Sequence, residues 1–343
     1  MSLLREIKGA VSARFEPSSG ESAAESENKP DVGFVACIEG GVLEAQALLL
    51  FESIRRYTGP FKNCSIYALS PRAGHGISRH AGKKLDKLAV EYSDIILNTE
   101  CPEYGSANRV AAAAHIEATR RHDILVILDS DTIFLREPRE FVLSPGVDAA
   151  VRPVDVKGIS TSGRMDLFDT YWRDLCRCCG ADYEGIPWGK SFIDCESIKA
   201  NYNGGLVVVR SELGILHRWA DFFFKSVREG LRPYADGPAF QAGAGWVSSE
   251  VGKFWGSNQA ALSVAIWSTS TRVQELPMTY NYPLHLHSRI DPALAADVFP
   301  SLVHVHYHWL FGKDSLSANP LFLRDGPLSE EQRAWLCSAT PLS

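Results

Sequence analysis

The sequence lacks both a membrane-length apolar run and a broad basic region. Its longest apolar stretches are of strand length or are interrupted by charges, well short of the roughly twenty residues that span a bilayer. Lysine and arginine total 35 against 41 acidic residues, giving a formal net charge of −6. Because nucleic-acid phosphates are held by clustered cations, we expect no nucleic-acid partner.

The beginning of the chain also lacks the apolar core of a secretory signal peptide, because Arg5, Glu6, Lys8 and Arg14 interrupt it. We therefore expect a cytoplasmic protein. The apolar residues of 1–15 nevertheless recur at helical spacing, so this segment is interpreted either as an amphipathic helix or as a segment that packs on the domain or stays disordered. An amphipathic helix would allow peripheral contact with the cytoplasmic face of a membrane.

Eight cysteines are too few for a disulfide scaffold of 343 residues, so reduced thiols are expected. Cys176, Cys178 and Cys179 form a cluster, with Cys195 further along the chain. Their spacing lacks the two-residue gap of common zinc knuckles, and thiols are therefore favoured over a zinc site.

Composition divides the chain into three parts. Residues 1–31 are predicted to be a disordered or amphipathic leader, because 16–31 are rich in Ser, Glu, Pro and Gly. Residues 32–325 are predicted to form a single domain, in which the character of the sequence changes at about residue 153. Residues 326–343 are interpreted as a C-terminal tail.

The ordered part has the pattern of an α/β protein. Residues 32–37, 65–69 and 124–128 are apolar runs typical of parallel strands buried on both faces. A helical pattern over 43–57 lies between the first two runs, which predicts a βαβ unit. Ligands bind outside the carboxyl ends of such strands, and the turn Glu39-Gly40-Gly41 lacks the G-x-G-x-x-G fingerprint of dinucleotide sites.

Further elements are predicted with less regular patterns. We expect a short strand at 95–97, a helix over 110–121 capped by Ser106, and a strand at 149–153. Residues 155–200 lack clear periodicity, and a long irregular section of this kind is usually functional or mobile. We interpret it as an acceptor-binding region.

Two aspartates follow the strand 124–128. In an extended backbone Asp129 and Asp131 point to the same side, where they would form a site for Mg²⁺ or Mn²⁺ that also binds a diphosphate. The alternative is an ordinary turn, which Asp and Ser also favour.

Polar residues also accompany two later strands. Asn203 enters the apolar run 206–209 through Gly204 and Gly205, which predicts close approach of a ligand or simply a turn. His304, His306 and His308 alternate along 302–309 and are candidate metal ligands or hydrogen-bonded structural residues.

The order of these motifs resembles the GT-A nucleotide-diphospho-sugar transferases. The closest resemblance is to the glycogenin-like and lipopolysaccharide galactosyltransferase-like branch, which retains anomeric configuration. It covers roughly residues 32–313, from the first strand and glycine turn through Asp-Ser-Asp, Asn-x-Gly-Gly and Asn-Gln to the histidine-rich strand. The resemblance implies a mixed, mostly parallel central sheet flanked by helices. It also implies that 32–325 is a single catalytic domain, with a nucleotide-sugar-binding half over 32–153 and an acceptor-binding half over 154–325.

The resemblance also implies an activity and its residues. A sugar would move from a nucleoside diphosphate sugar, UDP-sugar favoured, to a hydroxyl acceptor such as a glycan, a glycolipid or a small metabolite, with Mn²⁺ or Mg²⁺ as cofactor. Metal binding would fall to Asp129, Asp131 and His306, with His304 or His308 as alternates. Asn203 and Gln259 would face the reacting sugar. The implied donor-binding residues are Cys37, Glu39, Gly40, Asn108, Arg109, Asp129, Ser130, Gly204, Gly205 and Lys313.

Two departures from the family's pattern leave alternatives open. The family's late Lys-Pro-Trp ending is replaced here by residues 309–314, and the acidic residue usually beside the glutamine is Asn258. If the reaction inverted configuration, a carboxylate would have to deprotonate the acceptor, with Asp236, Glu250 and Glu196 as candidates. The alternative functions are a sugar-nucleotide nucleotidyltransferase, which usually has a basic loop after the first strand, and a non-catalytic carbohydrate-binding protein.

Overall fold

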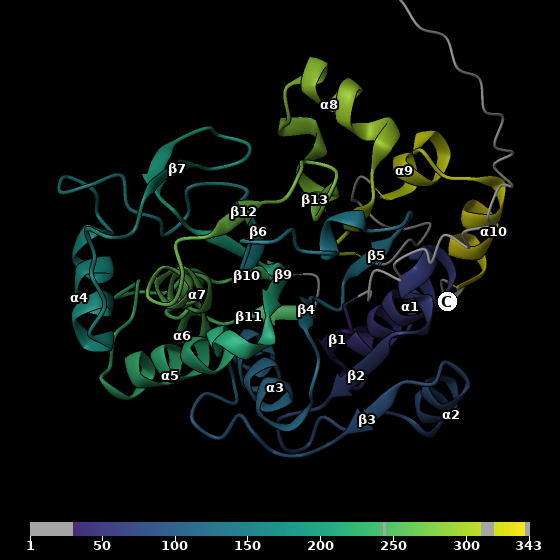
Figure 1. The fold of residues 1–343 in the computed structure, drawn as a ribbon, viewed down its shortest axis with the longest axis horizontal. Coiled ribbons are helices and arrows are strands. Elements are labelled where there is room, and N and C mark those ends of the chain that lie inside the picture. Colours follow the sequence, from purple (N-terminus) through teal and green to yellow (C-terminus); the bar gives the residue numbers. More distant parts are fainter. Residues whose placement is uncertain (1–29, 243–244, 310–318, 340–343) are drawn as a thin grey trace, which may run out of the picture.

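The computed structural model describes residues 30–242, 245–309 and 319–339, which are built around a seven-stranded sheet (Figure 1). The strands follow the order β12 (Val273–Glu275), β6 (Ala149–Pro153), β9 (Tyr202–Arg210), β4 (Ile124–Leu128), β1 (Val32–Cys37), β2 (Ser65–Leu69) and β3 (Glu91–Ser93). Only β9 runs antiparallel to its neighbours β4 and β6, while the other pairs are parallel. The predicted mixed, mostly parallel sheet is therefore confirmed.

The central strands are apolar throughout because both faces of the sheet are covered. All residues of β4 are buried. In β1, Phe34 and Val35 point to opposite sides, as neighbours in a strand must, and they join different hydrophobic clusters.

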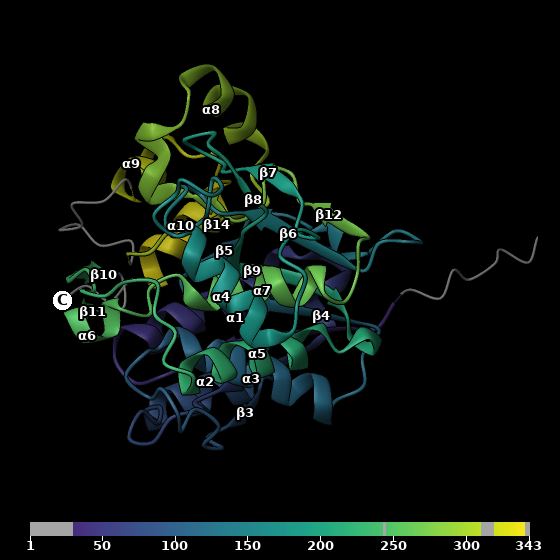
Figure 2. The same cartoon turned by 90° about the vertical axis from the view of Figure 1, so that its left-hand side faces the viewer.

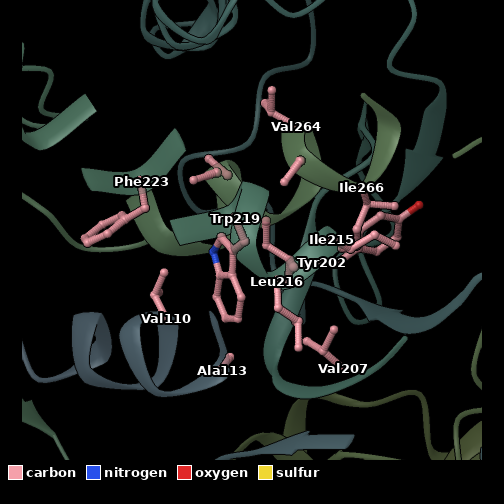
Figure 3. Packing of buried hydrophobic residues seen from close by; sticks show 14 of the residues in the cluster. Val110, Ala113, Tyr202, Val207, Ile215, Leu216, Trp219, Phe223, Val264 and Ile266 are labelled. Atoms are coloured by element: carbon pink, nitrogen blue, oxygen red, sulfur yellow. The ribbon is translucent and has the colours of Figure 1, made fainter. Parts of the chain in front are cut away.

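One face of the sheet is covered by a group of helices. They are α3 (Ser106–Thr119), α4 (Asp169–Cys179), α5 (Ile215–Arg228) and α7 (Ser257–Trp267). Figure 3 shows Trp219 of α5 among Val110 and Ala113 of α3 and residues of α7 and β9. Its indole Nε1 donates a hydrogen bond to the backbone oxygen of Asn258, 2.7 Å away. This contact ties the start of α7 to the centre of the core.

The opposite face packs against α1 (Val42–Tyr57) and α2 (Arg79–Lys87). Beyond them lies a small sheet in which β14 (His304–His306) pairs with both β13 (Tyr282–Pro283) and β5 (Thr132–Phe134). Helices α8 (Pro292–Val298), α9 (Asn319–Asp325) and α10 (Glu330–Ala339) belong to this end of the molecule, as Figures 1 and 2 both show. The remaining elements are β7 (Trp188–Lys190), β8 (Ser197–Lys199), β10 (Phe240–Ala242), β11 (Gly245–Val247) and α6 (Ser249–Gly252).

Three local predictions were wrong. The short strand after α2 is β3 at 91–93, and residues 95–97 lie outside it with Ile95 and Ile96 exposed. Ser106 is the first residue of α3, which starts earlier than predicted, and Gly105 holds the cap position. Residues 155–200 are not irregular throughout, because they contain α4 and the antiparallel pair β7 and β8. Buried residues at 171, 172, 175 and 176 give α4 the spacing of an amphipathic helix.

The ends of the chain can be placed only in part. Of the predicted leader, residues 1–29 lie outside the described residues. Part of the segment interpreted as a tail forms α10, whose Trp335 and Leu336 are buried in the hydrophobic cluster that includes Leu49 of α1. Within the described part of the chain, every helix is too short or too polar to cross a bilayer.

Candidate active site

A cavity of about 580 Å³ lies where the parallel strands end. Because β4 and β6 are both antiparallel to β9, they point the same way and their carboxyl ends meet at one edge of the sheet. The residues that follow these strands line the cavity: Glu39 after β1, Asp129 and Asp131 after β4, and Asp155 after β6. The start of β9 contributes Asn203 from the opposite direction. The edge therefore concentrates carboxylates around an open space.

Asp131 forms a compact group with two histidines. Its carboxylate oxygens lie 3.3 Å from Nε2 of His306 and 3.3 Å from Nδ1 of His308. Burial opposes ionisation, but His306 and His308 outweigh it and hold the pKa of the Asp131 carboxyl well below its usual range. One ligand atom from each residue can be chosen so that all lie within 4.8 Å of one another. This donor set suits a divalent transition metal ion.

The other two histidines of this region differ in their surroundings. His285 lies beside the group, with its ring centroid 3.9 Å from that of His308, and its Nδ1 has no hydrogen-bond partner among the described residues. Burial lowers the pKa of His285 to about 2, so its imidazole is neutral. His304 is fully buried against the ring of Phe134 and lies outside the group.

Asp129 and Asp131 both line the cavity, but they have different partners. Residues 130–131 form a turn between β4 and β5, with the Thr132 hydroxyl donating to the backbone oxygen of Asp129, so the strand alternation ends at Leu128. The carboxylate of Asp129 instead forms an ion pair with buried Arg109. Asp129 is therefore not in the group of Asp131, His306 and His308, and its role in metal binding stays a prediction.

Gly204 and Gly205 make room for this ion pair. A Cβ atom on Gly204 would lie 2.6 Å from Nη2 of Arg109, and one on Gly205 would lie 2.9 Å from Oδ2 of Asp129. Both distances are far below normal contact. Neither glycine is among the residues that line the cavity. Both are buried next to the ion pair, where their lack of a side chain leaves space for Arg109 and Asp129.

We expect Gly204→Ala to destabilise the protein by about 1–3 kcal/mol, because the methyl group would push the Arg109 guanidinium away from Asp129. Urea unfolding measures this change. Gly82→Ala is the matched control, since Gly82 lies in α2 with open space around its Cβ position and the substitution should stabilise by about 0.5–1 kcal/mol. Equal stability of the two variants would show that the space beside Arg109 is not needed.

A second network holds the residues after β1 and β2. The Glu39 carboxylate accepts two hydrogen bonds from Arg72, at 2.7 and 2.6 Å, and one from Nδ2 of Asn108 at 2.8 Å. Asn98 in turn donates to Oδ1 of Asn108 at 2.8 Å. Glu39 and Asn108 are buried, yet both lie in the cavity wall together with half-buried Cys37, the thiol pKa of which burial raises to about 12.

Asp155 also lines the cavity, where it contacts the predicted residue Asn203. One carboxylate oxygen lies 3.0 Å from Nη2 of Arg152, and the other accepts a hydrogen bond from Nδ2 of Asn203 at 2.9 Å. Burial raises the pKa of Asp155, and the positive charge of Arg152 opposes that shift. Asp155 was missed from the sequence, although it follows the predicted strand 149–153 just as Asp129 follows β4.

The other predicted residues divide into three sets. Ser130, Asn258 and Gln259 line the cavity, and Asn258 accepts a hydrogen bond from the Tyr104 hydroxyl at 2.8 Å. Gly40, Asp236, Glu250 and Glu196 are not among the lining residues. Lys313 lies outside the described residues. Sequence reasoning also missed Arg72 and His285, of which only Arg72 follows a predicted strand.

Comparisons with known proteins agree on the class of the chain. A model of the Rhodobacterales glycosyltransferase domain matches residues 34–236, more than half of the chain. The apo structure of WbbM, a bifunctional glycosyltransferase, aligns over 91% of this chain with a TM-score of 0.51 and 13% identity. The present chain spans about half of WbbM, since the alignment covers 52% of that protein.

Two further results complete the comparison. A structure of an active-site mutant of LgtC aligns over 91% of this chain and 97% of its own, with 10% identity and a TM-score of 0.48. No curated protein matches this chain significantly. The family match confirms the glycosyltransferase predicted from the order of motifs, and the structure confirms the predicted fold. The chain belongs to the Rhodobacterales glycosyltransferase domain family and is a glycosyltransferase with a GT-A fold.

Proposed function

We propose that the protein transfers a sugar from a nucleoside diphosphate sugar, most favourably a UDP-sugar, to a hydroxyl acceptor with the help of a bound divalent cation. The observation that carries this proposal is the Asp131, His306 and His308 group beside the cavity of a glycosyltransferase fold. Asp131 and His306 would hold the cation, with His308 as a third ligand. The acceptor hydroxyl would belong to a glycan, a glycolipid or a small metabolite.

The residues present fit such a cation. The group combines one carboxylate with two imidazoles. The neutral ring of His285 lies beside His308, and its Nδ1 has no hydrogen-bond partner in the part of the chain that the structure describes. A divalent cation bound there would neutralise charge on the diphosphate leaving group. Imidazole-rich donor sets suit Mn²⁺ better than Mg²⁺, which prefers oxygen ligands, and we therefore favour Mn²⁺.

Residues of the chain would position the donor around the cation. Arg109 places a buried positive charge in the cavity wall, where it would add to the attraction for phosphate. Glu39, held rigidly by Arg72 and Asn108, would present polar atoms to the nucleoside. Asn203 and Gln259 would face the transferred sugar, with Asn203 oriented by its hydrogen bond to Asp155.

The placement of carboxylates supports a retaining reaction. Inversion needs a base near the acceptor hydroxyl, and none of Asp236, Glu250 and Glu196 lines the cavity. The carboxylates that do line it at the ends of β1, β4 and β6, those of Glu39, Asp129 and Asp155, are each paired with an arginine. In a retaining reaction the acceptor attacks on the side of the departing diphosphate, and a phosphate oxygen accepts the hydroxyl proton. The residues around the cavity then need only to bind and orient the two substrates.

Thermal unfolding with nucleotides tests the donor and the cation together. We expect UDP to raise the melting temperature with Mn²⁺ present, by more than GDP or CDP does, and to have little effect in EDTA. At a ligand concentration of one hundred times Kd the stabilisation is about 2.7 kcal/mol. An equal UDP shift in EDTA would refute the cation requirement, and the absence of a shift with all three nucleotides would refute this donor class.

A further inference from the structure

Two tryptophans that line the cavity keep much of their surface exposed. Trp246 on β11 is 67% exposed, and Trp255, just before α7, is 37% exposed. Large aromatic surfaces gain free energy when they leave water, so exposed aromatic side chains at a cavity mark a binding surface. In contrast, Trp219 is fully buried in the core.

Both tryptophans lie in the segment 245–256, which leads into α7 and forms part of the cavity wall. The ring of Phe240 on β10 meets the ring of Trp255 edge to face, with centroids 4.7 Å apart and an interplanar angle of 88°. Gly256, with φ +85°, then turns the chain into α7, and a Cβ there would lie 2.9 Å from Ile159. The ring of Trp255 is thus held in place by Phe240, while part of its surface stays accessible.

This wall differs in chemistry from the edge formed by the strand ends. The strand-end residues are mainly charged or amide groups, including Glu39, Asp131 and Asp155. The segment that leads into α7 contributes Trp246 and Trp255, and the first turn of α7 contributes Gln259. A nucleoside diphosphate matches the charged edge, whereas the aromatic wall matches a ligand with both an apolar face and hydroxyl groups.

A pyranose ring has these two properties. Its axial C–H bonds form an apolar face that packs on aromatic rings, and its equatorial hydroxyls need amide or carboxylate partners. We propose that Trp246 and Trp255 form a stacking wall for the acceptor, and that the acceptor is a pyranoside glycan rather than a small acyclic metabolite. This inference rests on the proposed function, because it assumes that the strand-end edge holds the donor.

Saturation-transfer NMR with UDP and diamagnetic Mg²⁺ present tests the wall directly. The probes are methyl β-galactopyranoside and methyl β-glucopyranoside, with glycerol as an acyclic hydroxyl compound. For the wild-type protein we expect saturation of the pyranoside ring protons but not of glycerol. Trp246→Ala and Trp255→Ala should each raise the pyranoside Kd by about tenfold. Trp246→Phe should retain most of the binding, because it keeps an aromatic face.

Trp188→Ala is the matched control, since Trp188 is 55% exposed and lies outside the cavity wall. It should bind both pyranosides as the wild-type protein does. Equal weakening in Trp188→Ala, unchanged pyranoside binding in both cavity variants, or weaker UDP binding with unchanged pyranoside binding would each overturn the stacking wall. Absence of UDP binding by the wild-type protein would instead refute the proposed function itself, so the two failures are distinguishable.

Discussion

Replacement of Asp131 by alanine is expected to lower sugar transfer by about 1,000-fold or more, with the fold preserved. Asp131 is the only carboxylate in the group with His306 and His308, and it contacts both rings. Without it, only two imidazoles would remain to hold the cation, and the negative charge on the departing diphosphate would no longer be neutralised effectively. The initial rate at saturating donor and Mn²⁺ measures the effect.

The control for this variant is Asp297→Ala. Asp297 is an exposed residue of α8 and should leave both activity and nucleotide binding unchanged. We also expect Asp131→Ala to lose the Mn²⁺-dependent part of the UDP thermal shift while its far-UV circular dichroism matches that of the wild-type protein. Undiminished turnover in Asp131→Ala would remove the proposed cation site from the reaction.

The largest effect on stability is expected from Trp219→Ala. This side chain lies fully buried among α3, α5, α7 and β9, as Figure 3 shows. Its removal leaves a large cavity and deletes the hydrogen bond to the backbone oxygen of Asn258. The expected loss is about 3–5 kcal/mol. Urea denaturation followed by circular dichroism gives the free energy of unfolding.

Trp188→Ala provides the comparison for the same chemical change at the surface, and it should alter the free energy of unfolding by less than about 1 kcal/mol. Trp219→Phe should recover part of the loss, because it fills much of the cavity but lacks the indole N–H. If Trp219→Ala proved as stable as Trp188→Ala, the packing between α5 and α7 would not depend on this side chain.

The sheet could be predicted from the sequence because its strands are buried on both faces. The runs 32–37, 65–69 and 124–128 contain no polar residue except at an edge, and their short length between turn residues favours buried strands over helices. The prediction failed where burial was partial. Ile95 and Ile96 are apolar but exposed, and β3 instead pairs residues 91–93 with β2.

From the residues alone, the cavity wall was easiest to predict where it follows directly from a strand end. Glu39 and Asp131 are such residues, and Asp155 satisfies the same rule although it was overlooked. Partners from distant segments are set by the tertiary fold. Nothing local to the sequence indicates that Arg109 takes the Asp129 carboxylate, or that His285 lies beside His308.

Side-chain alternation alone was also insufficient for the histidines. It placed residues 304, 306 and 308 on one side, but β14 ends at His306, and His308 adopts a left-handed backbone conformation with φ +58°. In that conformation the ring of His308 contacts Asp131, whereas the ring of His304 packs against Phe134 of the neighbouring strand β5. The prediction of His306 as the preferred histidine agrees with its position, but its role in metal binding stays a prediction.

The pairing of β14 with β5 sets His306 opposite Thr132, the residue next to Asp131. Main-chain hydrogen bonds therefore hold these distant parts of the polypeptide together before any ion arrives. Insertions in the chain between residues 135 and 303 would leave this spacing intact, provided that both strands still pair. A shift of one position along β14, however, would bring Val305 or Tyr307 to the place of the imidazole.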